Sequence, residues 1–152
     1  MLALKEKLME DLSTKGAYTV TDSMKAFMKD FVGGYATESE NAAGIRHLAD
    51  ETGYIIDTHT GVASCVYKKY VTETGDKTPT VIASTASPYK FAPAVCDAIG
   101  CPTDDSIFKT LSALSAKTGT EIPTPLSSAE KLDVRFTEVI RKDEMASLVF
   151  RV

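Results

Sequence analysis

A run of small residues, Ser84-Thr85-Ala86-Ser87, three of which carry hydroxyl groups, has the residue types and the position to bind a ligand. It follows an apolar run, 80–83, whose β-branched residues favour a buried strand, and it precedes Pro88, which suits a first helical turn. A strand that leads through a small polar turn into a helix directs unpaired N–H groups and hydroxyls at one place. The alternative is an ordinary strand-to-helix connection of an α/β domain that binds nothing.

Two other places carry ionisable side chains near a predicted helix start. Asp57 and His59 are two residues apart, which allows a catalytic pair, although residues so placed more often cap and close the first turn of a helix. Lys90 lies in the first turn after Pro88, where an ammonium group can attract a phosphate. The alternative for Lys90 is an exposed lysine without such a role.

The three cysteines indicate neither a disulfide framework nor a metal site. Their odd number is typical of a protein from the reducing cytosol. Cys96 and Cys101 lack a second pair of ligands, and neither His47 nor His59 is near them in the sequence. We therefore expect Cys65 and these two to be unreactive thiols, with no bound metal and a cytoplasmic location.

Most of the secondary-structure elements that position these residues are predicted to be helices. Apolar residues at helical spacing predict helices that begin near 4, 21–22, 37, 57–58, 88, 103–106 and 143. Short apolar or alternating runs predict strands at 54–56 and 80–83, and a third at 134–139. The expected fold class is α/β, rich in helices, with two or three short parallel strands. We expect one domain over 1–152, with 119–128 as a candidate linker.

Two predicted helix faces are specific enough to check. One carries methionines and phenylalanines at 24, 27, 28 and 31, a stripe that is more often packing than a ligand pocket. The other lies in the helix after Thr37, where Glu40 completes a capping box and Ile45 belongs to the apolar side. His47 is off that side, next to Arg46, and is expected at the surface.

Composition excludes several classes of function. The 152 residues are 43% hydrophobic, which is enough for a compact core. The formal net charge of −4 offers no surface for nucleic acid or for an anionic membrane. No apolar run approaches the roughly 18 residues that span a bilayer. The first residues pass directly into charged ones and do not look like a signal peptide.

Three motifs resemble those of the threonine synthase family, in the family's order and at about its spacing. Residues 85–91, TASPYKF, resemble the family's T-A-H-P-x-K-F motif, and residues 53–63, GYIIDTHTGVA, resemble G-Y-x-x-D-P-H-T-A-V-A. Residues 31–35, FVGGY, before an acidic helix start, are also similar to that family. The likeness covers roughly residues 1–100.

The resemblance implies a fold-type II enzyme that uses pyridoxal 5′-phosphate to convert O-phosphohomoserine and water to threonine and phosphate. In such enzymes a late hydroxyl side chain faces the pyridine nitrogen of the cofactor, and that position maps onto Thr85. A neutral hydroxyl leaves the ring a weaker electron sink than a carboxylate does, which suits elimination and replacement chemistry. The alternative is that Thr85 is a buried strand-end hydroxyl bonded to the backbone.

Other parts of the family pattern are missing. The chain has no F-K-D motif with the Schiff-base lysine and no S-G-N-x-G phosphate loop. It therefore resembles the C-terminal portion of the large domain, which should be inactive alone, should bind no cofactor, and should have the lysine-bearing half of the enzyme as its partner. Ser87 replaces the histidine of one motif and Thr58 the proline of the other, so no role of that histidine can be transferred here.

Two other interpretations stay open. The chain can be a stand-alone, non-catalytic α/β binding or interaction module that kept this scaffold. Another enzyme of the same fold type, such as a dehydratase, fits less well because of His59 and the 88–91 motif. If the chain is a piece of a larger domain, its uncovered apolar surface predicts a homodimer in isolation.

Overall fold

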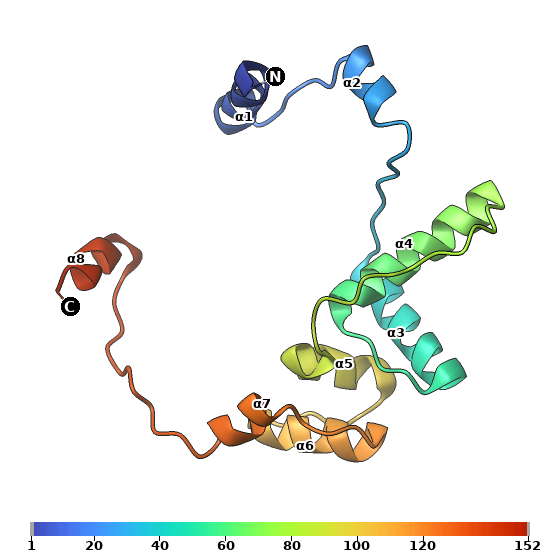
Figure 1. The fold of residues 1–152 in the computed structure, drawn as a ribbon. Helices are drawn as coiled ribbons and strands as arrows, with labels where there is room; N and C mark the ends of the chain where they lie inside the picture. The colour runs from blue at the N-terminus through green and yellow to red at the C-terminus, as the bar shows by residue number, and fades with distance from the viewer. Residues whose placement is uncertain (1, 152) are drawn as a thin grey trace. The chain divides into compact units, whose positions relative to one another are not determined.

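The computed structural model describes residues 2–151 and is built from helices joined by extended connections (Figure 1). These residues divide into two compact units, one within 1–35 and one within 36–152. No helix in the described part of the chain is both long enough and apolar enough to cross a membrane. That the two units form one domain of a larger enzyme stays a prediction.

The first unit contains two helices, α1 (Leu2–Lys15) and α2 (Asp22–Phe27). Thr21 caps α2, because its hydroxyl accepts a hydrogen bond from the Met24 N–H at 3.3 Å. The helix ends earlier than expected, and the side chains of Phe27 and Phe31 are largely exposed. The described residues therefore do not cover the predicted packing face of this helix.

The second unit is organised around the crossing of α3 (Glu38–Thr52) and α4 (Thr58–Thr74). The predicted capping box is present: the Glu40 N–H donates to the Thr37 hydroxyl at 3.3 Å, and the Thr37 N–H donates to Glu40 Oε2 at 2.7 Å. A Cβ atom at Gly61 would lie 2.1 Å from Asn41 Oδ1, and one at Gly44 would lie 2.6 Å from Cys65 Sγ. Glycine at these two positions therefore lets the helices approach closely.

A short second layer packs on α3. Pro88–Phe91 form a 3₁₀ turn, η1, that leads into α5 (Ala92–Ile99), and α6 (Ile107–Thr118) packs against α5. Gly100 ends α5 in the left-handed region at φ 69°, which lets the Cys101 N–H donate to the Cys96 carbonyl at 2.8 Å.

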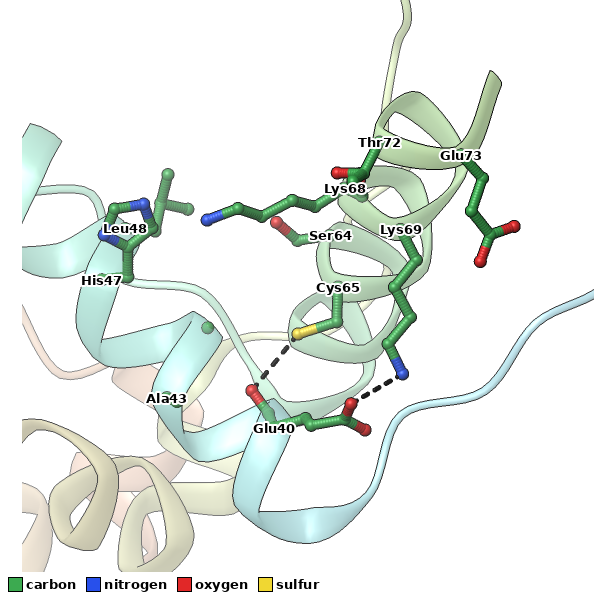
Figure 2. Close-up of a pocket in the computed structure, with 11 residues that line it drawn as sticks. Glu40, Ala43, His47, Leu48, Ser64, Cys65, Lys68, Lys69, Thr72 and Glu73 are labelled. Atoms are coloured by element: carbon green, nitrogen blue, oxygen red, sulfur yellow. Dashed lines mark hydrogen bonds and ion pairs between the residues drawn. The ribbon is translucent and has the colours of Figure 1, made fainter. Parts of the chain in front are cut away.

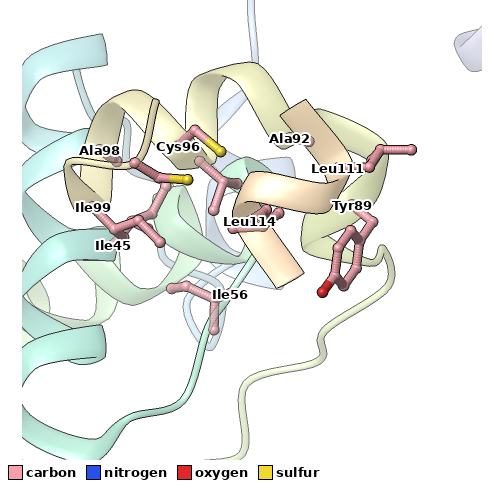
Figure 3. Packing of buried hydrophobic residues seen from close by; sticks show 11 residues of the cluster. Ile45, Ile56, Tyr89, Ala92, Cys96, Ala98, Ile99, Leu111 and Leu114 are labelled. Atoms are coloured by element: carbon pink, nitrogen blue, oxygen red, sulfur yellow. The ribbon is translucent and has the colours of Figure 1, made fainter. Parts of the chain in front are cut away.

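These elements share one hydrophobic core, most of which is labelled in Figure 3. Ile45 of α3, which the sequence placed on the apolar side, is buried in it, and His47 is exposed, as predicted. The buried apolar members are Ile45, Ile56, Tyr89, Ala92, Val95, Cys96, Ala98, Ile99, Cys101, Leu111 and Leu114.

The remaining elements are short. Helix α7 (Thr124–Ala129) overlaps the segment 119–128 that the sequence suggests as a linker, and Leu126 packs against the core. The 3₁₀ turn η2 (Lys142–Glu144) leads into α8 (Met145–Val149), close to the last helix that the sequence predicts.

The α/β expectation is not confirmed, because residues 2–151 contain helices but no strand. The three segments expected as strands, 54–56, 80–83 and 134–139, are irregular connections. A strand is stable only where a neighbour pairs with its N–H and C=O groups, and no such neighbour lies beside these segments in the described residues. Val81, in the middle of one segment, is 94% exposed.

Candidate functional site

Asp57 anchors the start of α4 from a fully buried position, with none of its side chain exposed. Its Oδ1 accepts hydrogen bonds from the backbone N–H groups of His59 at 2.8 Å and Thr60 at 3.4 Å. Its Oδ2 accepts a bond from the Thr60 hydroxyl. Asp57 is therefore the N-cap of α4, which is the role that the sequence favoured.

The same contacts keep Asp57 ionised. Burial by itself opposes the charged form, but the hydrogen bonds from the Thr60 hydroxyl and from the His59 and Thr60 N–H groups outweigh it. The net effect lowers the pKa of Asp57 below its ordinary value. The carboxylate is therefore a fixed negative charge that only accepts hydrogen bonds.

His59 lies beside this carboxylate and faces outward. Its Nδ1 is 3.3 Å from Asp57 Oδ1, while 66% of its side chain is exposed. Its ring contacts the ring of Phe91, with centroids 4.8 Å apart and planes tilted by 53°. The structure thus brings the histidine of one motif against the phenylalanine of the other.

The two motifs are also joined by hydroxyl groups. The side-chain oxygens of Thr60 and Ser84 are 3.1 Å apart, a hydrogen bond between residues that are 24 positions apart in the sequence. Sequence reasoning singled out neither Thr60 nor the contact. The sequence does contain one hint of the contact, because Thr60 directly follows His59 and Ser84 directly precedes Thr85.

Thr85 lies at the exposed end of this arrangement. Its side chain is exposed, and the structure shows no hydrogen bond to its hydroxyl from residues 2–151. It is therefore not the buried, backbone-bonded hydroxyl of the alternative interpretation. Ser87, two residues later, caps η1 by accepting a hydrogen bond from the Tyr89 N–H at 3.3 Å.

Lys90 belongs to the 85–91 motif but makes only a modest contact. It is exposed, and its Nζ lies 5.5 Å from the centroid of the Phe91 ring, which is a cation–π distance. The structure therefore leaves Lys90 available to a ligand without assigning one to it.

A cavity of about 430 Å³ opens where the motifs meet. Thr58 and His59 of α4, Phe91 of η1 and Asn41 of α3 are among the residues that line it. Asn41 is 6% exposed, and its amide oxygen is buried without a hydrogen-bond partner among the described residues. The cavity wall thus combines an imidazole, an aromatic ring and an amide group.

A larger cavity of about 510 Å³, the α3–α4 groove, is lined by neither Thr85 nor Asp57 (Figure 2). Lys69 and Glu40 close one side with an ion pair of 2.8 Å, and the Cys65 thiol donates to the Glu40 carbonyl at 3.3 Å. The Lys69 ammonium and the Thr37 N–H and hydroxyl lower the pKa of Glu40 to about 2. These contacts hold the two helices together.

Cys96 and Cys101 are buried in the core and Cys65 is half-buried, and none of the three forms a disulfide within the described residues. Burial and the neighbouring Cys101 and Asp97 raise the pKa of Cys96 to about 12, and burial and Glu40 raise the pKa of Cys65. Within residues 2–151 no three His, Cys, Asp or Glu side chains gather in a way that could hold a metal ion.

Comparison with known proteins finds threonine synthases and threonine synthase-like proteins similar to this chain. Residues 60–148 match the family model "Threonine synthase, C-terminal". Threonine synthase of Saccharomyces cerevisiae is 27% identical over 91% of this chain and 28% of its own length. Human threonine synthase-like 1 is 39% identical over 50% of this chain and 10% of its own length. The chain therefore spans less than a third of these relatives.

Two solved structures of threonine synthases are also similar to this chain. A PLP-bound threonine synthase from Brucella melitensis superposes with a TM-score of 0.53 and 26% identity, over 68% of this chain and 22% of that one. The yeast threonine synthase structure superposes with a TM-score of 0.71 over 98% of this chain and 29% of that one. At 24% identity the yeast structure is evidence for the fold alone.

Proposed function

The chain belongs to the threonine synthase family through its C-terminal domain, and from this we propose that it is the C-terminal part of a pyridoxal-phosphate-dependent threonine synthase. The complete enzyme would convert O-phosphohomoserine and water to threonine and phosphate. Its cytoplasmic location stays a prediction.

One observation supports this proposal most directly. The two motif regions, far apart in the sequence, meet through the Thr60–Ser84 hydrogen bond and the His59–Phe91 ring contact. Their meeting leaves the Thr85 hydroxyl exposed and without a partner in the described part of the chain. A ligand-binding edge needs an unused polar group of this kind, because a hydroxyl already bonded to the protein has less to offer a ligand.

The residues present fit one edge of the cofactor. The neutral Thr85 hydroxyl suits an unprotonated pyridine nitrogen, to which it can donate a hydrogen bond. When bound, pyridoxal phosphate supplies the electron sink for the reaction. The lysine that holds the cofactor would come from the other half of the enzyme, since no motif for it occurs in this sequence. Alone, the chain should bind no cofactor and be inactive.

The other half of the enzyme is also the proposed partner of the extended segments. Residues 80–83 carry the exposed Val81, and residues 134–139 carry the exposed Phe136 and Val139. Parallel strands in α/β enzymes are buried on both faces and paired on both edges. We propose that these segments become strands only when the rest of the large domain pairs with them. The isolated chain should then form dimers, which light scattering would reveal.

The test uses the complete reading frame of the gene. Its purified product should bind pyridoxal phosphate and release phosphate from O-phosphohomoserine, while residues 1–152 alone should do neither. A natural product of only these 152 residues, with no bound cofactor, would instead support the stand-alone binding module. Stoichiometric imine absorption by the 152-residue chain that survives dialysis would contradict the proposed division of the site.

A further inference from the structure

The α3–α4 groove is a cavity of about 510 Å³ that the proposed function does not use. Its apolar lining includes Ala43, Gly44 and Leu48 of α3 and Cys65 of α4. A Cβ atom at Gly44 would lie 2.6 Å from Cys65 Sγ, so glycine is needed for the close approach of the two helices here. The groove therefore offers apolar surface beside a tight helix crossing.

Charged side chains border this apolar lining, and one of them is not neutralised. Lys69 and Glu40 form an ion pair of 2.8 Å. Lys68, the preceding residue, is exposed and lies within ion-pair distance of no carboxylate among residues 2–151. Its side chain extends from α4 toward Leu48 and His47 of α3 (Figure 2). One end of the groove, the Lys68 end, thus carries an ammonium group that an anion can neutralise.

The Ser64 hydroxyl supplies a second hydrogen-bond donor at this end. Ser64 and Lys68 share one face of α4, because they are four residues apart, and both line the groove. The hydroxyls of Thr72 and Thr74 bond back to the carbonyls of Lys68 and Tyr70, as hydroxyls inside helices often do. The half-buried Ser64 hydroxyl makes no such bond, and none of residues 2–151 gives it another hydrogen bond. It is therefore available to a ligand.

We propose that the Lys68 end of the α3–α4 groove binds a small organic carboxylate with a short apolar tail. The Lys68 ammonium and the Ser64 hydroxyl donate hydrogen bonds to the carboxylate, and the tail packs against Leu48 and Ala43. This site goes beyond the proposed function and does not depend on it.

The charges around the groove favour a singly charged anion. The ammonium group of Lys68 matches the single charge of a carboxylate and forms a charge-assisted hydrogen bond with it. A phosphate monoester carries about −1.5 to −2 charges at neutral pH. Its excess charge would meet the carboxylates of Glu40 and Glu73, which also line the groove. His47 borders the Lys68 end, but its Nε2 lies 3.4 Å from Glu51 Oε2 on the same helix, and it is not needed as a contact.

Nuclear magnetic resonance titrations of the 152-residue chain test the ligand class. Butyrate is the probe, acetate lacks two of its methylene groups, and 1-butanol keeps an apolar tail without the charge. Butyrate should shift the signals of Ser64 and Leu48 to saturation. It should bind roughly three- to tenfold more tightly than acetate, because burying one methylene group fully strengthens binding about fourfold.

Three results would overturn the proposed ligand. They are the absence of saturable butyrate binding, equally tight binding of 1-butanol, and tighter binding of inorganic phosphate at the same residues. Weaker binding of all three comparison compounds than of butyrate would support it.

Substitutions then test the two contacts. Lys68→Met removes the charge and keeps an unbranched side chain, and Lys68→Arg keeps the charge. Lys68→Met should weaken butyrate binding at least about fivefold, even after allowance for the exposure of the ammonium group, and Lys68→Arg should retain most of it. Ser64→Ala should weaken it by about two- to tenfold, since one hydrogen bond is lost.

Lys77→Met is the matched control. Lys77 is exposed, does not line the groove, and its replacement changes the net charge by the same amount. It should leave butyrate binding unchanged. Unchanged binding in Lys68→Met, or an equal loss in Lys68→Met and Lys77→Met, would show that the groove has no specific carboxylate site. Circular dichroism of each variant confirms that its helices persist, so that lost binding is not mistaken for unfolding.

Discussion

Residues 36–118 and residues 130–151 show two opposite ways of using apolar side chains. In the first region, capped helices converge and bury a shared core that runs from Ile45 to Leu114. In the second, Val134, Phe136 and Val139 are almost wholly exposed. The difference shows that helices with local caps and a common core can form within this chain, whereas segments with a strand-like pattern need neighbours from elsewhere.

The largest effect should come from opening a cavity in the first region. Leu114 is 0% exposed and Val139 is 95% exposed. Leu114→Ala should lower the free energy of unfolding by about 2–5 kcal/mol, because the surrounding core cannot fully close around the missing atoms. Val139→Ala should change it by less than about 0.5 kcal/mol. Urea unfolding followed by circular dichroism measures the free energy of unfolding of both variants. Equal losses would contradict the proposed difference between the two regions.

The next effect concerns the close crossing of α3 and α4. Gly61→Ala places a Cβ atom 2.1 Å from Asn41 Oδ1 and 2.9 Å from Ile45 Cγ1, so these buried side chains or the helices that carry them must shift. We expect a loss of about 1–3 kcal/mol, despite the better helix propensity of alanine, which alone would add about 1 kcal/mol. Gly33→Ala, with no heavy atom within 4 Å, is the control. Higher stability for Gly61→Ala would show that the crossing is loose.

Acid should weaken the first region through Glu40. The pKa of Glu40 is about 2 in the folded chain against an ordinary 4.5, so the unfolded chain takes up the proton first as the pH falls. The stabilisation from this group is therefore complete above about pH 4.5 and is lost as the pH falls towards 2. Asp57, whose pKa is also lowered, acts in the same direction.

Glu40→Gln isolates that contribution. Glutamine can still close the capping box but does not titrate. Unfolding free energies measured between pH 6 and pH 3 should fall less steeply in Glu40→Gln than in the parent chain. Identical slopes would mean that the ion pair with Lys69 does not persist in solution.

The smallest effect on stability is expected at Thr85. Its exposed hydroxyl makes no hydrogen bond within the described residues, so Thr85→Val should leave the melting temperature unchanged. In the complete enzyme the same change should weaken cofactor binding several-fold, since one neutral hydrogen bond is worth about 0.5–1.5 kcal/mol. Thr85→Asp should increase side reactions such as transamination relative to threonine formation, because a carboxylate favours a protonated ring. If Thr85→Val lowered the melting temperature and left cofactor binding unchanged, the role of Thr85 would be structural.

The sequence predicts those structural features that depend only on neighbouring residues. Capping at Thr37 and Asp57 depends on residues within one helical turn, and both caps are present. The three expected strands are not confirmed in residues 2–151, because a strand depends on partners that an apolar pattern does not reveal. The sequence also predicted a longer second helix, with residues 24, 27, 28 and 31 on its packing face. The helix ends at Phe27, and nothing in the described unit covers that face.

Only part of the candidate site could be predicted from the sequence. The resemblance pointed to Thr85, Asp57 and His59, and the structure adds that Thr85 is exposed. Thr60 and its bond to Ser84 were missed because the two residues are 24 positions apart, and only the tertiary structure brings them together. The contact between His59 and Phe91 is likewise a product of packing.

The amide oxygen of Asn41, which has no hydrogen-bond partner among residues 2–151, makes this position a target for engineering. A buried acceptor without a donor costs about 1–3 kcal/mol, and an apolar side chain of similar shape avoids that cost. Asn41→Leu could therefore produce a more heat-resistant scaffold from a single replacement at the tightest point of the helix crossing. A laboratory that needs this domain in quantity, for crystals or for binding experiments, can begin with this variant.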